Sequence, residues 1–337
     1  MKILVTGGAG FIGSHTIVEL HNAGYESVIL DNFSNSEEKA IQGIETIIGK
    51  SVKYYNADIL DATAWDKVFT EQKIDGIIHF AAAKAVGESV QLPLKYYKNN
   101  VAGTALMLEK MLEHGVKNLV FSSSCTVYGE PDTLPVTETS AVKKALSPYG
   151  NTKQICEEII TDTVASATDF HAISLRYFNP IGAHESALIG ELPLGVPANL
   201  VPFLTQAVAG IRGKLAVYGT DYPTPDGTAI RDYIHVVDLA KAHVAAIKLV
   251  TSQRDGRYYD IFNIGTGKGS SVLEVITAFE KATGITVEYE TKPRREGDVV
   301  SVYADCTKSN NVLGWTAELS LVEALRDAWK WQKNIIA

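Results

Sequence analysis

A strand, a glycine-rich turn and a helix at the start of the chain constrain its fold more than any other feature. The apolar run KILVT leads directly into GGAGFIG, residues 7–13, and SHTIVEL then has the pattern of a helix. Gly8, Gly10 and Gly13 fit G-x-G-x-x-G, while Gly7, Gly10 and Gly13 fit a related spacing. Because such a turn lets the backbone approach a pyrophosphate at a helix N-terminus, we predict a dinucleotide-binding unit rather than a simple structural turn.

An acidic residue follows the turn at the expected distance. Asp31 ends the next apolar run, SVILD, 18 residues after Gly13, where a carboxylate can take the ribose hydroxyls of an adenosine. Asn32 and Phe33 come next, with no arginine to hold a ribose phosphate, so we expect NAD rather than NADP. Asp58 ends a further strand-like run; it either reaches the adenine or only caps a helix.

Strand-like and helical patterns alternate along the first half of the chain. Helical patterns separate several of the apolar runs, which are KILVT, SVILD, VKYYNAD, GIIHFAA, NLVFSSS and AISLRYFN. The alternation predicts an α/β fold, a doubly wound parallel sheet with helices on both faces. After about Ile181 the sequence becomes rich in proline and glycine. We therefore predict a nucleotide-binding domain over residues 1–180 and a smaller mixed α/β lobe over 181–337, with later elements partly interleaved.

The composition of the chain limits which partners and which cellular location we expect for the protein. The 337 residues carry a net charge of −8 and no basic run longer than KPRR, so we do not expect a nucleic acid partner. No apolar stretch is long enough to cross a membrane, and the N-terminal apolar run is too short for a signal peptide, which favours the cytoplasm. The three cysteines form no pairing pattern. The eight histidines show no ligand spacing, so no metal is expected, and His79 and His235 are interpreted as packed core residues.

The stretch SPYGNTK, residues 147–153, places a tyrosine and a lysine four residues apart at the start of a predicted helix. Residues at this spacing lie on one helix face, so the Lys153 ammonium can favour the phenolate of Tyr149. The cationic ring of a bound oxidised nicotinamide adds a second charge. Tyr149 would then act as a general base, and Ser124, at the end of NLVFSSS, would hydrogen-bond the reacting oxygen. Taken singly, each of the three also fits an ordinary structural role.

Seven segments carry a resemblance to a known family. In chain order they are TGGAGFIGSHT, HFAAAKAVGESV, FSSSCTVYGE, SPYGNTK, LRYFNPIGAH, DGTAIRDYIHVVDLA and PRREGD. Together they resemble the UDP-glucose 4-epimerases of the extended short-chain dehydrogenase/reductase superfamily, over essentially the whole chain. The resemblance implies a Rossmann fold and a homodimer, with the seam on the helices at TALMLEKMLEHG and after SPYGNTK. It also implies a tightly held NAD, which oxidises carbon 4 of a UDP-hexose and returns the hydride to the opposite face.

The resemblance also implies roles for single residues. The catalytic matches are Ser124, Tyr149 and Lys153. The matches around the cofactor are Gly7, Gly10, Phe11, Ile12, Gly13, Asp31, Asn32, Asp58, Ile59, Phe80, Ala81, Lys84, Asn99, Ser122, Tyr149, Lys153, Tyr177 and Phe178. The matches around the UDP-sugar are Ser124, Tyr149, Asn179, Asn199, Leu200, Tyr218, Arg231, Arg295, Asp298 and Val302. Arg231 and Arg295 suit a diphosphate, since one guanidinium group can donate two hydrogen bonds to phosphate oxygens.

Val302 departs from the strict glucose/galactose epimerases, which have a bulky tyrosine at the matching position. A valine leaves room for an acetamido group, so we expect turnover of UDP-GlcNAc and UDP-GalNAc as well, unless the ring of Tyr303 fills that space.

Three other functions remain alternatives. A sugar-nucleotide dehydratase would need an Asp-Glu pair where this chain has Cys125 and Thr126. An NAD-linked reductase would exchange its cofactor at each turnover. A non-catalytic nucleotide sensor would tend to lose the tyrosine or the lysine.

Overall fold

The computed structural model describes residues 1–254, 256–295 and 298–336. A seven-stranded sheet dominates it, in the order β11-β6-β5-β4-β1-β2-β3, and all neighbouring strands in it are parallel. The strands are β1 (Lys2–Thr6), β2 (Glu26–Asp31), β3 (Lys53–Asn56), β4 (Gly76–His79), β5 (Asn118–Ser122), β6 (Phe170–Tyr177) and β11 (Arg257–Ile264). The chain winds outwards from β1 in both directions, so the predicted doubly wound parallel sheet is confirmed.

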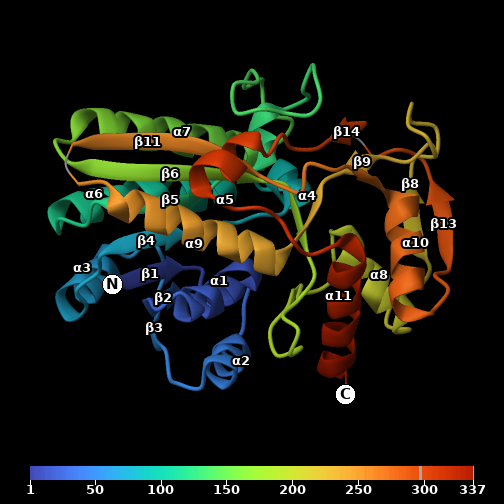
Figure 1. Ribbon diagram of the computed structural model, residues 1–337, viewed down its shortest axis with the longest axis horizontal. Helices are drawn as coiled ribbons and strands as arrows, with labels where there is room; N and C mark the ends of the chain where they lie inside the picture. Colours follow the sequence, from blue (N-terminus) through green and yellow to red (C-terminus); the bar gives the residue numbers. More distant parts are fainter. Residues whose placement is uncertain (255, 296–297, 337) are drawn as a thin grey trace.

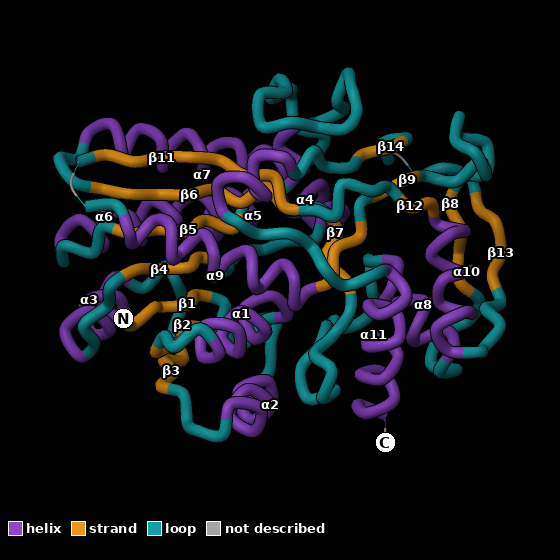
Figure 2. Tube along the Cα trace, viewed as in Figure 1, coloured by secondary structure: helices purple, strands orange, loops and turns teal. Residues whose placement is uncertain are grey.

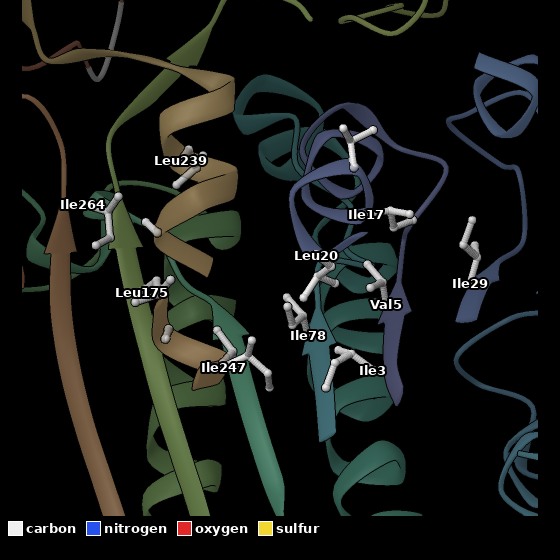
Figure 3. Close-up of a cluster of buried hydrophobic side chains, with 14 of the residues drawn as sticks. Ile3, Val5, Ile17, Leu20, Ile29, Ile78, Leu175, Leu239, Ile247 and Ile264 are labelled. Atoms are coloured by element: carbon white, nitrogen blue, oxygen red, sulfur yellow. The ribbon is translucent and has the colours of Figure 1, made fainter. Parts of the chain in front are cut away.

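Helices cover both faces of this sheet because its strands are apolar on both sides. In β1, Ile3 and Val5 point into one core and Leu4 into the other, as the alternation of side chains along a strand requires. The first core is closed by α1 (Phe11–Asn22), α2 (Glu38–Ile48) and α9 (Val236–Ser252), and part of it is drawn in Figure 3. The second is closed by α3 (Ala62–Glu71), α6 (Gly103–Glu113) and α7 (Pro148–Ser166).

A smaller part of mixed composition lies at one end of the large sheet (Figure 1). It contains the helices α8 (Leu200–Val208), α10 (Val272–Thr283) and α11 (Leu321–Ile336), which share a third core. Its short strands are β7 (Asn179–Ile181), β8 (Leu215–Tyr218), β9 (Ile230–Arg231), β10 (Tyr233–His235), β12 (Ser270–Ser271), β13 (Tyr289–Lys292) and β14 (Ser301–Val302). They pair as β7 with β10, β8 with β13, and β9 between β12 and β14 (Figure 2).

The carboxyl ends of the sheet strands face this smaller part: β1 starts near the N-terminal label and runs towards the smaller part (Figure 1). Short elements lie between the longer ones along the chain: α4 (Val86–Gln91), α5 (Pro93–Tyr96), the π-helical turns Tyr97–Ala102 and Ser309–Leu313, and the 3-10 turn Cys125–Tyr128. Strand β11 and helix α9 follow residue 180 yet belong to the large sheet. The division of the chain at residue 180 therefore stays a prediction. No helix among the described residues is long and apolar enough to cross a bilayer.

Candidate active site

The glycine turn between β1 and α1 has the close backbone packing that the motif predicts. Gly7 has a φ of 68°, and a Cβ atom there would lie 2.8 Å from the backbone nitrogen of Ala81. A Cβ atom on Gly13 would lie 2.3 Å from the carbonyl oxygen of Gly7. Gly10 precedes α1 and offers no side chain to cap it, so the N–H groups at Phe11 and Ile12 are left for an anion. This turn fits a dinucleotide pyrophosphate.

The acidic residues at the ends of β2 and β3 lie beside that turn. The Asp31 carboxylate accepts hydrogen bonds from the backbone nitrogens of Ala9, at 3.0 Å, and Phe33, at 2.9 Å. Asn32 donates through its side chain to Asp58 at 2.8 Å, which joins the two strand ends. Ile59 is buried and would contact any Cβ atom on Gly103 of α6, at 2.5 Å. The structure thus brings these four cofactor candidates to one edge of the sheet.

Tyr149 and Lys153 lie on the first turns of α7, and two features stabilise the N-terminus of this helix. The Ser147 hydroxyl accepts a hydrogen bond from the nitrogen of Gly150, and Pro148 occupies the first helical position. Both catalytic candidates are buried, and the Lys153 Nζ lies 6.0 Å from the centre of the Tyr149 ring. The two residues therefore have the shared face that their spacing predicts.

Burial dominates the electrostatics of this pair. It raises the pKa of the Tyr149 hydroxyl; nearby Tyr177 adds to the rise, and a hydrogen bond with Ser124 opposes it. Burial lowers the pKa of Lys153 to about 8, against the opposing effect of Cys156 and Glu157. The Lys153 Nζ donates to the carbonyl oxygen of Ser122 at 2.7 Å. A tyrosine in this environment needs positive charge close by before it can accept a proton.

Ser124 stands where β5 ends and the 3-10 turn begins. Its hydroxyl oxygen accepts hydrogen bonds from the backbone nitrogen of Thr126, at 3.2 Å, and from the Thr126 hydroxyl, at 2.9 Å. Next along the chain, burial raises the pKa of the Cys125 thiol to about 12, and Arg231 opposes that rise. The charge of Arg231 therefore acts close to the catalytic candidates.

Six further cofactor candidates lie on or just after β4, β5 and β6, or in the π-helical turn before α6. The Ser122 hydroxyl donates to the Tyr177 hydroxyl at 2.8 Å, and the Phe80 ring packs on the ring of His243 with centres 4.6 Å apart. The nitrogen of Ala81 donates to the Thr6 hydroxyl at 3.4 Å. Phe178 is buried in the same small apolar cluster as Val302. Asn99 lies in the π-helical turn before α6, where its side-chain amide donates to that of Asn100 at 2.9 Å.

The candidates for the diphosphate come together around one carboxylate. Arg295 contacts Asp298 through Nε at 2.9 Å, and Arg231 approaches the same group at 3.7 Å. The Arg295 guanidinium also lies 5.0 Å from the centre of the Tyr218 ring. Glu296 and Gly297, which belong to the PRREGD motif, lie outside the described residues. Arg231 and Arg295, which are 64 positions apart in the sequence, thus share one acidic partner.

Val302 is buried beside Arg231, to which it is paired in the register of β14 and β9. A Cβ atom on Gly269 would lie 3.1 Å from the Tyr303 ring, so that ring lies against the turn before β12. The register of β14 with β9 thus places Val302 opposite Arg231, whereas the ring of the next residue, Tyr303, contacts Gly269.

Asn199 and Lys84, predicted for different ligands, contact the same residue. The side-chain amide of Asn199 donates to Glu191 at 3.1 Å, and the Lys84 Nζ donates to the same oxygen at 3.2 Å. Leu200 begins α8, and Asn179 begins β7, where its nitrogen donates to the carbonyl oxygen of Asp232 at 2.9 Å. Glu191 was not predicted, because a single carboxylate in a loop rich in proline and glycine gives no spacing signal.

The structure also contains a buried ion pair between Glu157 and Arg176, which was not predicted from the sequence. The available signal was the position of Glu157, four residues after Lys153 on the same helix.

His79 and His235 are 2% and 1% exposed, which agrees with their interpretation as packed core residues. Among the described residues, ligand-type atoms of Asp66, Glu113 and His114 also approach one another. Lys110 forms ion pairs with both of these acids, at 3.0 and 2.8 Å, which accounts for that cluster without a metal.

Comparisons with known proteins agree with this geometry. The family model described as GDP-mannose 4,6 dehydratase matches residues 4–328. The UDP-glucose 4-epimerase of Haemophilus influenzae is 50% identical over 334 residues, covering 99% of this chain and 98% of that protein. The crystal structure of the Stenotrophomonas maltophila UDP-glucose 4-epimerase, with bound NAD and formylated UDP-arabinopyranose, has a TM-score of 0.96 at 46% identity. This match covers 100% of the present chain and 99% of the Stenotrophomonas chain.

The Bifidobacterium longum UDP-glucose 4-epimerase, crystallised with NAD+ and UDP, has a TM-score of 0.95 at 48% identity. The match covers 99% of this chain and 98% of that one. Full-length similarity at this level, together with the shared fold, shows that this chain belongs to the UDP-glucose 4-epimerase family.

Proposed function

We propose that this protein is an NAD-dependent UDP-glucose 4-epimerase that interconverts UDP-glucose and UDP-galactose. The observation that carries the proposal is the burial of Tyr149 and Lys153 beside Ser124. Ser124 follows the carboxyl end of β5, at the same end of the sheet as the glycine turn after β1. A general base, its cation and a hydrogen-bonding hydroxyl are thereby next to a dinucleotide site.

The residues at the turn fit NAD. The first turn of α1 has no side-chain cap, and Gly7 and Gly13 are packed too closely for a side chain, which leaves the backbone open to a pyrophosphate. The Asp31 carboxylate ends β2, where its negative charge suits ribose hydroxyls and repels a ribose phosphate. When bound there, NAD would supply reversible hydride transfer at carbon 4 of the sugar.

The chain's own residues would move the proton. Tyr149 takes the proton of the hydroxyl on carbon 4 as the hydride leaves, and gives it back when the hydride returns. The Lys153 ammonium favours the phenolate, and its hydrogen bond to the Ser122 carbonyl fixes where that charge lies. Ser124 holds the sugar oxygen during both steps.

The UDP part would be held across the junction by Arg231 and Arg295. Both guanidinium groups are oriented by Asp298, so they are already close together before a diphosphate binds. Tyr218, Asn179, Asn199 and Leu200 complete the proposed site from β8, β7 and the start of α8.

The substrate range would include N-acetylated sugars. An epimerase has to turn the sugar over between oxidation and hydride return, and an acetamido group needs more room than a hydroxyl. The small side chain of Val302, with the Tyr303 ring against Gly269, supports interconversion of UDP-GlcNAc and UDP-GalNAc as well.

We further propose a homodimer formed through α6 and α7. Both helices cover the same face of the sheet, yet Leu112 remains 48% exposed. In the neighbouring α4–α5 segment, Leu92 and Leu94 are 51% and 81% exposed. These apolar side chains support an interface there. A cytoplasmic location is supported by three free cysteines, which are typical of a reducing compartment.

One assay separates the rival functions. Purified protein is incubated with UDP-galactose, UDP-GalNAc and a dTDP-hexose without added NAD, and the products are identified by chromatography. We expect UDP-glucose and UDP-GlcNAc, with NAD found by mass analysis of denatured protein. A 4-keto-6-deoxy product would indicate a dehydratase, strict dependence on added cofactor a reductase, and binding without turnover a sensor; each would overturn the proposal.

A further inference from the structure

Glu157 of α7, the helix that carries Tyr149 and Lys153, forms a buried ion pair with Arg176 of β6. Glu157 and Arg176 are 7% and 3% exposed. The Arg176 guanidinium donates from Nε to one carboxylate oxygen at 3.0 Å and from Nη2 to the other at 2.5 Å. The Ser123 hydroxyl donates to the first of these oxygens, also at 2.5 Å. Because desolvation largely offsets the attraction within a buried ion pair, stability alone is a weak reason for it.

Glu157 and Ser123 are each close in the sequence to a proposed catalytic residue. Glu157 lies one helical turn after Lys153 on α7, and both side chains are buried. Ser123 immediately precedes Ser124 at the end of β5. The Glu157 carboxylate therefore joins the helix that carries the base to the strand end that carries the serine.

The groups that face Lys153 show what Glu157 adds. From β5 come the Ser122 carbonyl and the Phe121 ring, 4.8 Å from Nζ, and both are uncharged. From β4 comes His79; burial, with a smaller contribution from Lys153, lowers its pKa to about 3, so it is neutral.

On α7 itself, Lys153 faces the Tyr149 ring and is influenced by Cys156 and Glu157. Burial raises the pKa of the Cys156 thiol, which is therefore neutral at physiological pH. Among these described neighbours, Glu157 carries the formal negative charge. The groups facing that carboxylate in turn are Arg176, Ser123, Tyr128 and Tyr259.

We propose that Glu157 is a positioning residue that keeps Lys153 charged, and holds the Ser124 strand end in place, while Tyr149 transfers the proton. The inference rests on the proposed epimerase function. Without the carboxylate, the buried ammonium loses its proton more easily. The charge that favours the Tyr149 phenolate then disappears at a lower pH than in the parent enzyme.

The test compares pH profiles of kcat for UDP-galactose in four proteins: the parent, Glu157→Gln, the double variant Glu157→Gln/Arg176→Met, and Glu158→Gln. The double variant leaves no unpaired buried arginine, since neutral side chains replace the whole pair. Glu158 is the next residue on α7 and is exposed, so its variant removes the same charge from the surface.

We expect Glu157→Gln to move the alkaline limb of the profile down by about 1 pH unit, as for the loss of a nearby opposite charge. The double variant should move it in the same direction but less, because it also removes the opposing charge of Arg176. NAD content and KM should stay near the parent values, and Glu158→Gln should match the parent. An unshifted limb in either folded, NAD-loaded Glu157 variant would overturn the inference. Loss of the fold in both would assign the pair to stability and overturn it as well. An inactive parent would instead reject the proposed function itself.

Discussion

Replacing Lys153 by methionine tests the electrostatic part of the mechanism. The side-chain length is nearly kept while the charge is removed. The Nζ lies 6.0 Å from the centre of the Tyr149 ring. At an effective dielectric constant of about 20, a unit charge at that distance stabilises a phenolate by about 3 kcal/mol, or about 2 pKa units. At neutral pH the variant should therefore form the phenolate about 100-fold less often.

The assay is kcat for UDP-galactose between pH 6 and 10, with bound NAD measured in every sample. We expect about 100-fold lower kcat than the parent at pH 7, with partial recovery as pH rises. The direction follows from the sign of the effect: losing a cation raises the pKa of Tyr149, so the phenolate appears only at higher pH.

Lys144→Met is the matched control, because this exposed lysine lies just before α7 and its loss removes the same charge from the surface. Its profile should equal that of the parent. A Lys153→Met protein that retains NAD and has the parent's kcat and pH profile would refute the assigned role of the ammonium. Loss of NAD from the variant would show that Lys153 acts mainly in holding the cofactor.

Further substitutions test the base, the turn and the sugar pocket. Tyr149→Phe should keep the fold and bound NAD but lower kcat by about 100-fold or more, the usual size of a general-base contribution; near-normal turnover would remove Tyr149 from the mechanism. Gly13→Ala should reduce the NAD content of purified protein, since its Cβ would lie 2.3 Å from the Gly7 oxygen. Gly87→Ala, at a helical site with open space, should leave that content unchanged, and equal NAD in both variants would contradict the packing argument. Val302→Tyr should suppress the reaction of UDP-GalNAc and spare that of UDP-galactose, as measured by product chromatography; an unchanged ratio of the two rates, or a parent inactive on UDP-GalNAc, would reject the broader range.

Local patterns were enough to predict the parts of the site that lie close together in the chain. The glycine turn and Asp31 belong to one βαβ unit, whose geometry is fixed by short-range backbone rules. Tyr149 and Lys153 share a helix face because of a four-residue spacing. Ser124 was found because parallel strands present ligand-binding groups at their carboxyl ends. The alternation of strands and helices likewise determined the fold class, which the structure confirms.

Contacts between distant segments needed the tertiary structure. Glu191 meets Lys84 across 107 positions, and Arg231 of β9 meets Asp298, which lies just before β14. Strand β11 returns to pair with β6, which no local pattern specifies. The physical reason is that side-chain chemistry identifies what a residue can bind, whereas the partner it meets depends on how the chain closes its long loops. Glu157 lies between these cases: its helix spacing pointed to Lys153, but only the packing of β6 against α7 supplied Arg176.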